Sequence, residues 1–276
     1  MYTSAPYADA VPKPRLIALP FHNGLPDVGM GLGVHALVDE LGRAADVVPA
    51  VDAWQPEVRR TIELDRRLGD RVRAAVSAGA FPLVLAGNCN SCLGTVGAVG
   101  SAGLGVVWFD AHADFDTPED NVSGFFDVMA LSTLTGSAWQ AQRAKVCAEP
   151  VAEERVVLAA VRDLEPYQRE RIERSRLLVA PGRLDGFEAA LEALEASRVY
   201  LHLDLDALDA SEGRANEYAA PGGPSLHAYL AAVDAVFDRF TVVAAALTAY
   251  DPAADEDGRA RTAAGALLGR VIERAA

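Results

Sequence analysis

The run Val156-Val-Leu-Ala-Ala-Val161 is apolar at every position. A strand with one solvated face alternates apolar and polar residues, so this run is typical of a strand that is covered on both faces. Parallel sheets with a layer of helices on each side contain such strands. The run therefore indicates an α/β protein.

Short apolar runs of this kind alternate with longer amphipathic segments along the rest of the chain. Eight runs are predicted strands: Arg15–Phe21, Asp46–Val51, Pro82–Ala86, Leu104–Asp110, Arg155–Arg162, Leu177–Ala180, Val199–Asp206 and Thr241–Tyr250. The segments between them predict helices at Gly33–Ala44, Val58–Ala78, Leu184–Ala196, Leu226–Phe240 and Ala260–Arg274. No linker or internal repeat stands out, so we predict one three-layer αβα domain over residues 1–276.

Composition and charge narrow the classes of partner. The chain has 276 residues, is 51% hydrophobic and carries a formal net charge of −14, so it can bury a large core. Its basic residues are dispersed, and we therefore expect no nucleic-acid partner. No apolar run approaches the roughly 18 residues of a membrane-spanning helix and no secretory signal is apparent, so we expect a cytoplasmic protein without membrane contact. Three cysteines are too few for a disulfide framework.

Acidic residues follow the predicted strand Leu104–Asp110. The sequence V-V-W-F-D-A-H-A-D-F-D runs from Val106 to Asp116. If the chain stays extended, side chains two residues apart share a face, so Asp110, His112 and Asp114 converge at the carboxyl end of the strand. Ligands of open α/β sheets bind at that edge.

A second acidic segment, V-Y-L-H-L-D-L-D-A-L-D, runs from Val199 to Asp209. Alternation places Asp204 and Asp206 on one face of this strand, with His202 either near them or buried elsewhere. Carboxylates from two strand ends in one crevice need cations, because each uncompensated buried charge costs several kcal/mol. Two divalent ions would meet this need. Oxygen ligands with one or two imidazoles favour Mn²⁺, with Zn²⁺ and Co²⁺ as alternatives.

Three motifs in this order resemble the arginase and agmatinase superfamily, the ureohydrolases. The segment Ala86–Asn90 (A-G-N-C-N) is similar to the family's G-G-D-H-S, Asp110–Asp114 to D-A-H-x-D, and Asp204–Asp209 to D-x-D-x-L-D-P. The resemblance spans nearly the whole chain and implies a single arginase-like domain with an eight-stranded parallel sheet. It also implies a binuclear metal-dependent hydrolase of linear guanidino compounds.

The resemblance further implies the role of each site residue. One metal ion would be held by Cys89, Asp110, Asp114 and Asp204, and the other by Asp110, His112, Asp204 and Asp206. Asp114 would also take a proton from the bridging water and pass it to the leaving amine. The substrate-facing positions of the family match Asp116, Ser123, Asp127 and Glu165.

Cys89 departs from the family pattern, which has histidine there. A thiolate is a soft, anionic ligand, so it would lower the Lewis acidity of the metal and shift the preference towards softer ions. Cys89 and Cys92 also form a C-x-x-C motif, which allows the alternative of a thiol redox protein.

Other departures concern the substrate. The family's guanidinium-binding glutamate is absent from Ala249–Pro252 (A-Y-D-P), and we predict that Asp127 replaces it as a catalytic residue that anchors the guanidinium. Asp116 could instead cap the loop at Thr117-Pro118, and Asp127 could cap a helix.

The predicted substrate is therefore a small cationic guanidino compound, such as arginine, N-hydroxyarginine or a related guanidino acid, cleaved to urea or hydroxyurea and an amine. A single-metal amide hydrolase resembling the deacetylases and a non-catalytic binding protein remain alternatives. The resemblance also implies a homo-oligomer.

Overall fold

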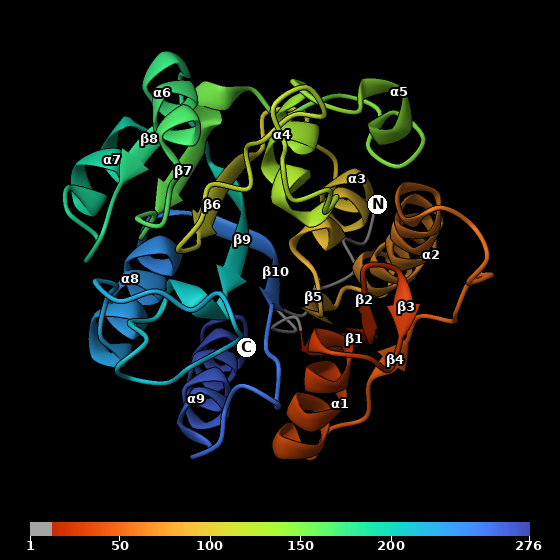
Figure 1. Cartoon of the computed structure of the whole chain (residues 1–276). Coiled ribbons are helices and arrows are strands. Elements are labelled where there is room, and N and C mark those ends of the chain that lie inside the picture. Colours follow the sequence, from red (N-terminus) through yellow and green to blue (C-terminus); the bar gives the residue numbers. More distant parts are fainter. Residues whose placement is uncertain (1–12) are drawn as a thin grey trace, which may run out of the picture.

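The computed structural model describes residues 13–276, and its centre is a sheet of eight strands (Figure 1). Their order is β4-β1-β5-β10-β9-β6-β7-β8, and all neighbouring strands are parallel. The strands are β1 (Pro14–Leu19), β4 (Asp46–Val47), β5 (Phe81–Ala86), β6 (Gly105–Phe109), β7 (Val156–Ala159), β8 (Leu178–Ala180), β9 (Arg198–Asp204) and β10 (Thr241–Thr248). This confirms the predicted parallel sheet.

Helices cover both faces of the sheet, and each face has its own apolar core. Along β5, Leu83 and Leu85 enter one core while Val84 and Ala86 enter the other, as the alternation of a strand requires. The helices α1 (Met30–Leu41), α7 (Phe187–Ala193), α8 (Leu226–Arg239) and α9 (Arg259–Arg274) contribute to the first core. The helices α2 (Glu57–Ser77), α3 (Cys92–Val99), α4 (Ala130–Thr135) and α6 (Pro166–Arg174) contribute to the second. The three-layer prediction is confirmed.

Several elements differ from the sequence prediction. The short hairpin of β2 (Phe21–His22) and β3 (Leu25–Pro26), and the helices α3, α4, α5 (Gln140–Arg143) and α6, were not predicted. Helix α3 contains two glycines and no clear period. A Cβ at Gly94 would lie 2.4 Å from the carbonyl oxygen of Asp65 in α2, so close packing, which the local sequence does not reveal, selects this helix.

The carboxyl ends of β5, β6 and β9 lie at the same edge of the sheet, and two of these strands end sooner than predicted. β6 stops at Phe109 and β9 at Asp204, so the predicted extensions through Asp110 and Asp206 are wrong. Asp206 lies instead in a short 3₁₀ helix, Leu205–Ala207. No helix in residues 13–276 combines the length and the apolar character needed to cross a membrane.

Candidate metal centre

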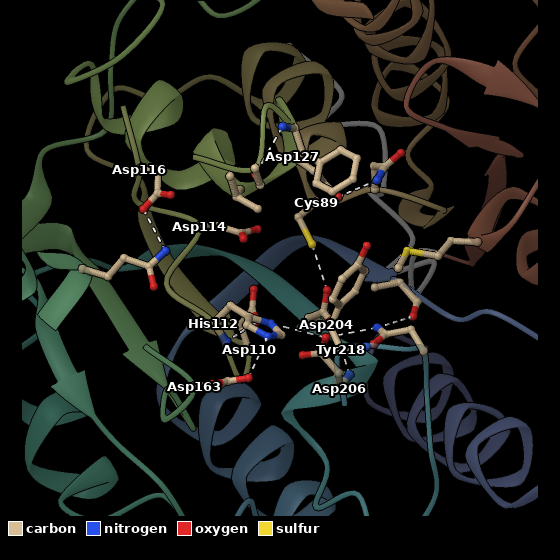
Figure 2. Close-up of a pocket in the computed structure, with 18 of the residues that line it drawn as sticks. Cys89, Asp110, His112, Asp114, Asp116, Asp127, Asp163, Asp204, Asp206 and Tyr218 are labelled. Carbon is tan, nitrogen blue, oxygen red and sulfur yellow. Dashed lines mark hydrogen bonds and ion pairs between the residues drawn. The ribbon is translucent and has the colours of Figure 1, made fainter. Parts of the chain in front are cut away.

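A cavity of about 340 Å³ opens at the carboxyl edge of the sheet. All the site residues predicted from the sequence line it: Cys89, Asp110, His112, Asp114, Asp116, Ser123, Asp127, Glu165, Asp204 and Asp206. Figure 2 shows most of them, with the acidic side chains arranged around the cavity. The structure thus brings together residues that are distant in the sequence.

The end of β6 supplies Asp110, which is 1% exposed. Its carboxylate accepts hydrogen bonds from the indole Nε1 of Trp108 at 3.1 Å and from the backbone N–H of His112 at 2.7 Å. Sequence analysis did not assign Trp108 a role at the site. Its position two residues before Asp110, on the same face of the strand, could have indicated this contact.

The loop after β6 is not extended, contrary to the geometry used in the prediction. Asp114 adopts the left-handed conformation with φ of 48°, which is uncommon for a residue other than glycine. Its carbonyl oxygen accepts hydrogen bonds from the backbone N–H groups of Leu131 and Ser132 in α4. These bonds hold the turn, and the Asp114 carboxylate lines the cavity.

The end of β9 carries Asp204 and Asp206 in a compact turn. Asp204 accepts a hydrogen bond from the backbone N–H of Asp206 at 2.9 Å. The Asp206 carboxylate in turn accepts bonds from the N–H of Ala111 at 3.2 Å and from Nδ2 of Asn216 at 3.0 Å. Asn216 is a buried site residue that sequence analysis missed, because it lies in a loop without periodicity.

His112 lies between the two strand ends. Its Nδ1 is 3.3 Å from Oδ1 of Asp110 and 3.5 Å from Oδ2 of Asp206, while its Nε2 is 3.7 Å from Oδ2 of Asp163. Although burial opposes the effect, the nearby Asp206 and Asp110 carboxylates raise the pKa of His112 well above its ordinary value. A carboxylate on the outer nitrogen is the usual way to orient a metal-binding imidazole, so Nδ1 is the atom available to a metal ion.

Cys89 begins a short 3₁₀ helix, Cys89–Ser91, separated from the end of β5 by two residues. Its Sγ donates to Oδ2 of Asp204 at 2.8 Å and lies 3.3 Å from Oγ1 of Thr248. Burial, and then the charges of Asp204 and Asp114, raise the pKa of the thiol well above its ordinary value. Cys92 is buried too, and its pKa is also raised, first by burial. A redox cysteine needs a lowered pKa, so these surroundings do not favour the thiol redox alternative.

The chemistry of the side chains fits divalent metal ions. Three groups have ligand atoms within 4.8 Å of one another: Asp110 with His112 and Asp206, Cys89 with Asp114 and Asp127, and Cys89 with His202 and Asp204. Burial, followed by repulsion from neighbouring carboxylates, raises the pKa of Asp110, Asp114 and Asp204. Such a concentration of buried acids is costly without cations. The first group consists of three predicted ligands of one ion. Each of the other two groups joins two predicted ligands of the second ion to a further residue, Asp127 or His202, which was not predicted as a ligand.

His202 is fully buried behind the centre. Its ring stacks on Trp108 with the ring centroids 3.6 Å apart, and its Nδ1 lies 2.9 Å from the hydroxyl of Tyr200. Burial lowers the pKa of His202 to about 3, which keeps the imidazole neutral at physiological pH. Thr248 Oγ1 links His202 Nε2, at 3.3 Å, to Cys89.

The Asp127 carboxylate has a structural role in addition to lining the cavity. Its carboxylate accepts hydrogen bonds from Nδ2 of Asn88 and from the backbone N–H of Asn90, so it caps the short helix that begins at Cys89. Burial raises its pKa to about 7, although these hydrogen bonds oppose the shift. Ala249, at the place of the missing family glutamate, also lines the cavity.

The other predicted substrate-facing residues are held by local contacts. Asp116 is buried and accepts hydrogen bonds from Tyr167, Gln168 and Asn121. Glu165 forms a capping box with Gln168 at the start of α6. Ser123 Oγ accepts a bond from the backbone N–H of Phe125 at 3.2 Å.

Comparison with known proteins decides the family. The model of the arginase family matches residues 34–272. The chain belongs to the arginase family. An arginase from Bacillus caldovelox is 28% identical over 244 residues, covering 84% of this chain and 82% of that protein. An arginase from Brucella melitensis is 30% identical over 217 residues, covering 71% of this chain and 70% of that protein.

Solved structures show the same relationship. The crystal structure of arginase from Bacillus cereus superposes with a TM-score of 0.79 at 25% identity, covering 95% of this chain and 98% of that chain. Formimidoylglutamase from Bacillus subtilis has the same fold, with a TM-score of 0.75 at 14% identity. The match covers 98% of this chain and 89% of that chain. The chain is a hydrolase of the arginase family, whose members use two metal ions to cleave C–N bonds of guanidino compounds.

Proposed function

We propose that this arginase-family chain hydrolyses a small cationic guanidino compound to urea, or a substituted urea, and an amine, with two Mn²⁺ ions at the candidate metal centre. The observation that carries this proposal is the meeting of the strand ends of β5, β6 and β9 in one cavity. They bring together Cys89, Asp110 and Asp204, with His112 and Asp206, the residues that would hold two divalent ions.

The two sets of ligands share residues. Asp110, His112 and Asp206 would hold one ion, with Asp204 beside them. Asp114 and Cys89 would hold the other, and Asp110 and Asp204 would contribute to both. When bound, the ions would supply positive charge and an activated water next to the guanidinium carbon.

The remaining steps belong to side chains of the protein. The Asp114 carboxylate accepts no hydrogen bond from another described residue and lines the cavity, so it is free to take a proton and return it to the leaving amine. Asp127 would bind the guanidinium, because its carboxylate is near both Cys89 and Asp114.

Metal analysis combined with a urea-release assay tests the proposal. The purified protein should be depleted of metal, reconstituted with Mn²⁺, Co²⁺ or Zn²⁺ in parallel, and assayed with a panel of guanidines. We expect two ions per chain and metal-dependent urea release that is greatest with Mn²⁺. A stoichiometry of one or less, or no urea from any guanidine, would contradict the proposal. Light scattering of the same samples tests whether the chain is a homo-oligomer.

A further inference from the structure

The charges on the cavity wall are strongly unbalanced. In the described part of the chain, eight of the lining residues are Asp or Glu, and none is Lys or Arg. Two divalent ions would offset half of these charges. The rest of the wall, which includes Asp116, Asp163 and Glu165, none of them a predicted metal ligand, therefore keeps a negative potential towards the substrate.

Three neutral hydrogen-bond donors near Asp116 are already bonded to its carboxylate. Asp116 is 2% exposed, and its Oδ2 accepts bonds from the hydroxyl of Tyr167 at 3.0 Å and from Nδ2 of Asn121 at 3.2 Å. Its Oδ1 accepts a bond from Nε2 of Gln168 at 2.9 Å. These are the neutral donors that could otherwise bind a substrate carboxylate here. All three are directed at Asp116 instead.

Ser123 is the neighbouring residue with a neutral donor. Its Oγ accepts bonds from the N–H of Phe125 and from Nδ2 of Asn121, and its own O–H lies 3.5 Å from Oδ1 of Asn121. Glu165 lines the cavity beside Gln168, and Asp163 is more than half exposed at its mouth. A carboxylate in this part of the cavity would face other carboxylates, whereas an ammonium group would be attracted to them.

We propose that the preferred guanidine ends in an amine and carries no carboxylate, and that Asp116 is the residue that determines this specificity. The inference rests on the proposed function, because it concerns the far end of the same substrate. It excludes guanidino acids, arginine among them, as the best substrates.

Four guanidines with similar four-carbon chains test the specificity in the Mn²⁺-loaded protein. Agmatine ends in an amine, butylguanidine has no second charged group, arginine carries an amine and a carboxylate, and 4-guanidinobutyrate carries only a carboxylate. We expect kcat/KM to decrease in that order, with agmatine above arginine by at least about tenfold. Arginine or guanidinobutyrate equal to agmatine or better would overturn the proposal.

The variant Asp116→Asn removes the charge while keeping the size of the side chain. It should raise the ratio of kcat/KM for arginine to that for agmatine by about tenfold or more. Glu119→Gln is the matched control, because Glu119 is an exposed carboxylate of the same loop outside the cavity lining. An unchanged ratio in a folded Asp116→Asn protein would show that Asp116 does not set the specificity.

A binding measurement separates this inference from the proposed function. Calorimetry with 1,4-diaminobutane, ornithine and 4-aminobutyrate requires no turnover and uses the unmodified, metal-loaded protein. The diamine should bind most tightly. If no guanidine releases urea but the diamine still binds best, the proposed function fails and the preference for an amine stands; if ornithine or 4-aminobutyrate binds best, the preference is wrong.

Discussion

The ends of β6 and β9 deliver the same kind of side chain to the cavity, yet they are held in different ways. At the end of β9, Asp204 and Asp206 accept hydrogen bonds from N–H groups and from Asn216. Beyond β6, the backbone N–H groups of residues 113–115 have no acceptor among the described residues, and Asp114 is left-handed. The β9 end is therefore held through its carboxylates and amides. The turn after β6 is held at Asp110 and through the carbonyl of Asp114, while the amides of residues 113–115 and the Asp114 carboxylate are not fixed by hydrogen bonds among the described residues.

Arg162 explains much of the order at the β9 side. Its guanidinium donates to the carbonyl oxygens of Asp206, Ala207 and Leu208, and also to those of Ala160, Ala220 and Pro221. A Cβ at Gly223 would lie 2.6 Å from the carbonyl oxygen of Ala207 and 2.7 Å from Nη2 of Arg162. The loop that contains Ala220 and Gly223 can therefore lie this close to Arg162 only with glycine at position 223. A single half-buried side chain therefore joins two loops and the end of β7.

The largest effect should come from removing a carboxylate that both ions share. Asp204→Ala and Asp110→Ala should each reduce the metal content from two ions towards one or none and lower kcat by about a thousandfold or more. Elemental analysis and the urea assay check this. Retention of two ions by both variants would contradict the shared-ligand arrangement.

Asp114→Asn should keep the fold and much of the metal but lower kcat by about 100-fold to 10,000-fold, the range for removal of a general acid or base. The asparagine retains an oxygen for the metal and cannot carry the proton. Metal content measured on the same sample separates the two roles. Near-normal turnover would remove Asp114 from proton transfer.

The strand ends explain why part of this centre could be predicted from the sequence. Asp110 and Asp204 follow directly from apolar runs, because a strand in a parallel sheet ends at the ligand-binding edge. Asp114 and Asp206 were placed in the cavity by an argument from alternation that the structure does not support. A left-handed residue and a 3₁₀ turn bring them there. The contacts of Arg162 and Asn216 depend on how distant loops meet, and no local pattern encodes that.

Arg162 should affect stability more than any exposed arginine. Arg162→Met leaves six carbonyl oxygens without this donor and should lower the free energy of unfolding by about 3 kcal/mol, whereas Arg162→Lys should recover part of the loss. Arg169→Met, on the exposed side of α6, is the control. Denaturant unfolding of the metal-free proteins measures these differences. Equal stability of the Met and control variants would show that the β9 turn does not depend on Arg162.

Cys89 tests whether the thiol contributes to the metal centre. Cys89→Ser should weaken Mn²⁺ binding by about tenfold, since a hydroxyl is a poorer ligand than a thiolate, and Cys89→His should tighten it. Titration of the metal-free proteins gives these affinities. Cys147→Ser is a control on a buried cysteine away from the cavity. If both Cys89 variants bind metal as the parent does, the cysteine is not a ligand.

The smallest expected effect is a change in amide hydrogen exchange, and it compares the ends of β6 and β9 directly. Chelation of the metal should speed amide hydrogen exchange at residues 113–115 by a few-fold, because their N–H groups have no acceptor and the metal ligand Asp114 is released. Exchange at Asp206, Leu208 and Asp209 should change much less, since their N–H groups bond to Asp204 Oδ1 and to the carbonyls of Leu205 and Pro224. Exchange measured by mass spectrometry before and after chelation resolves the two segments. In Arg162→Met the acceleration should become more similar in the two segments, because the β9 turn would then depend on the metal as well. Equal acceleration of both segments in the unmodified protein would show that the two ends are organised alike.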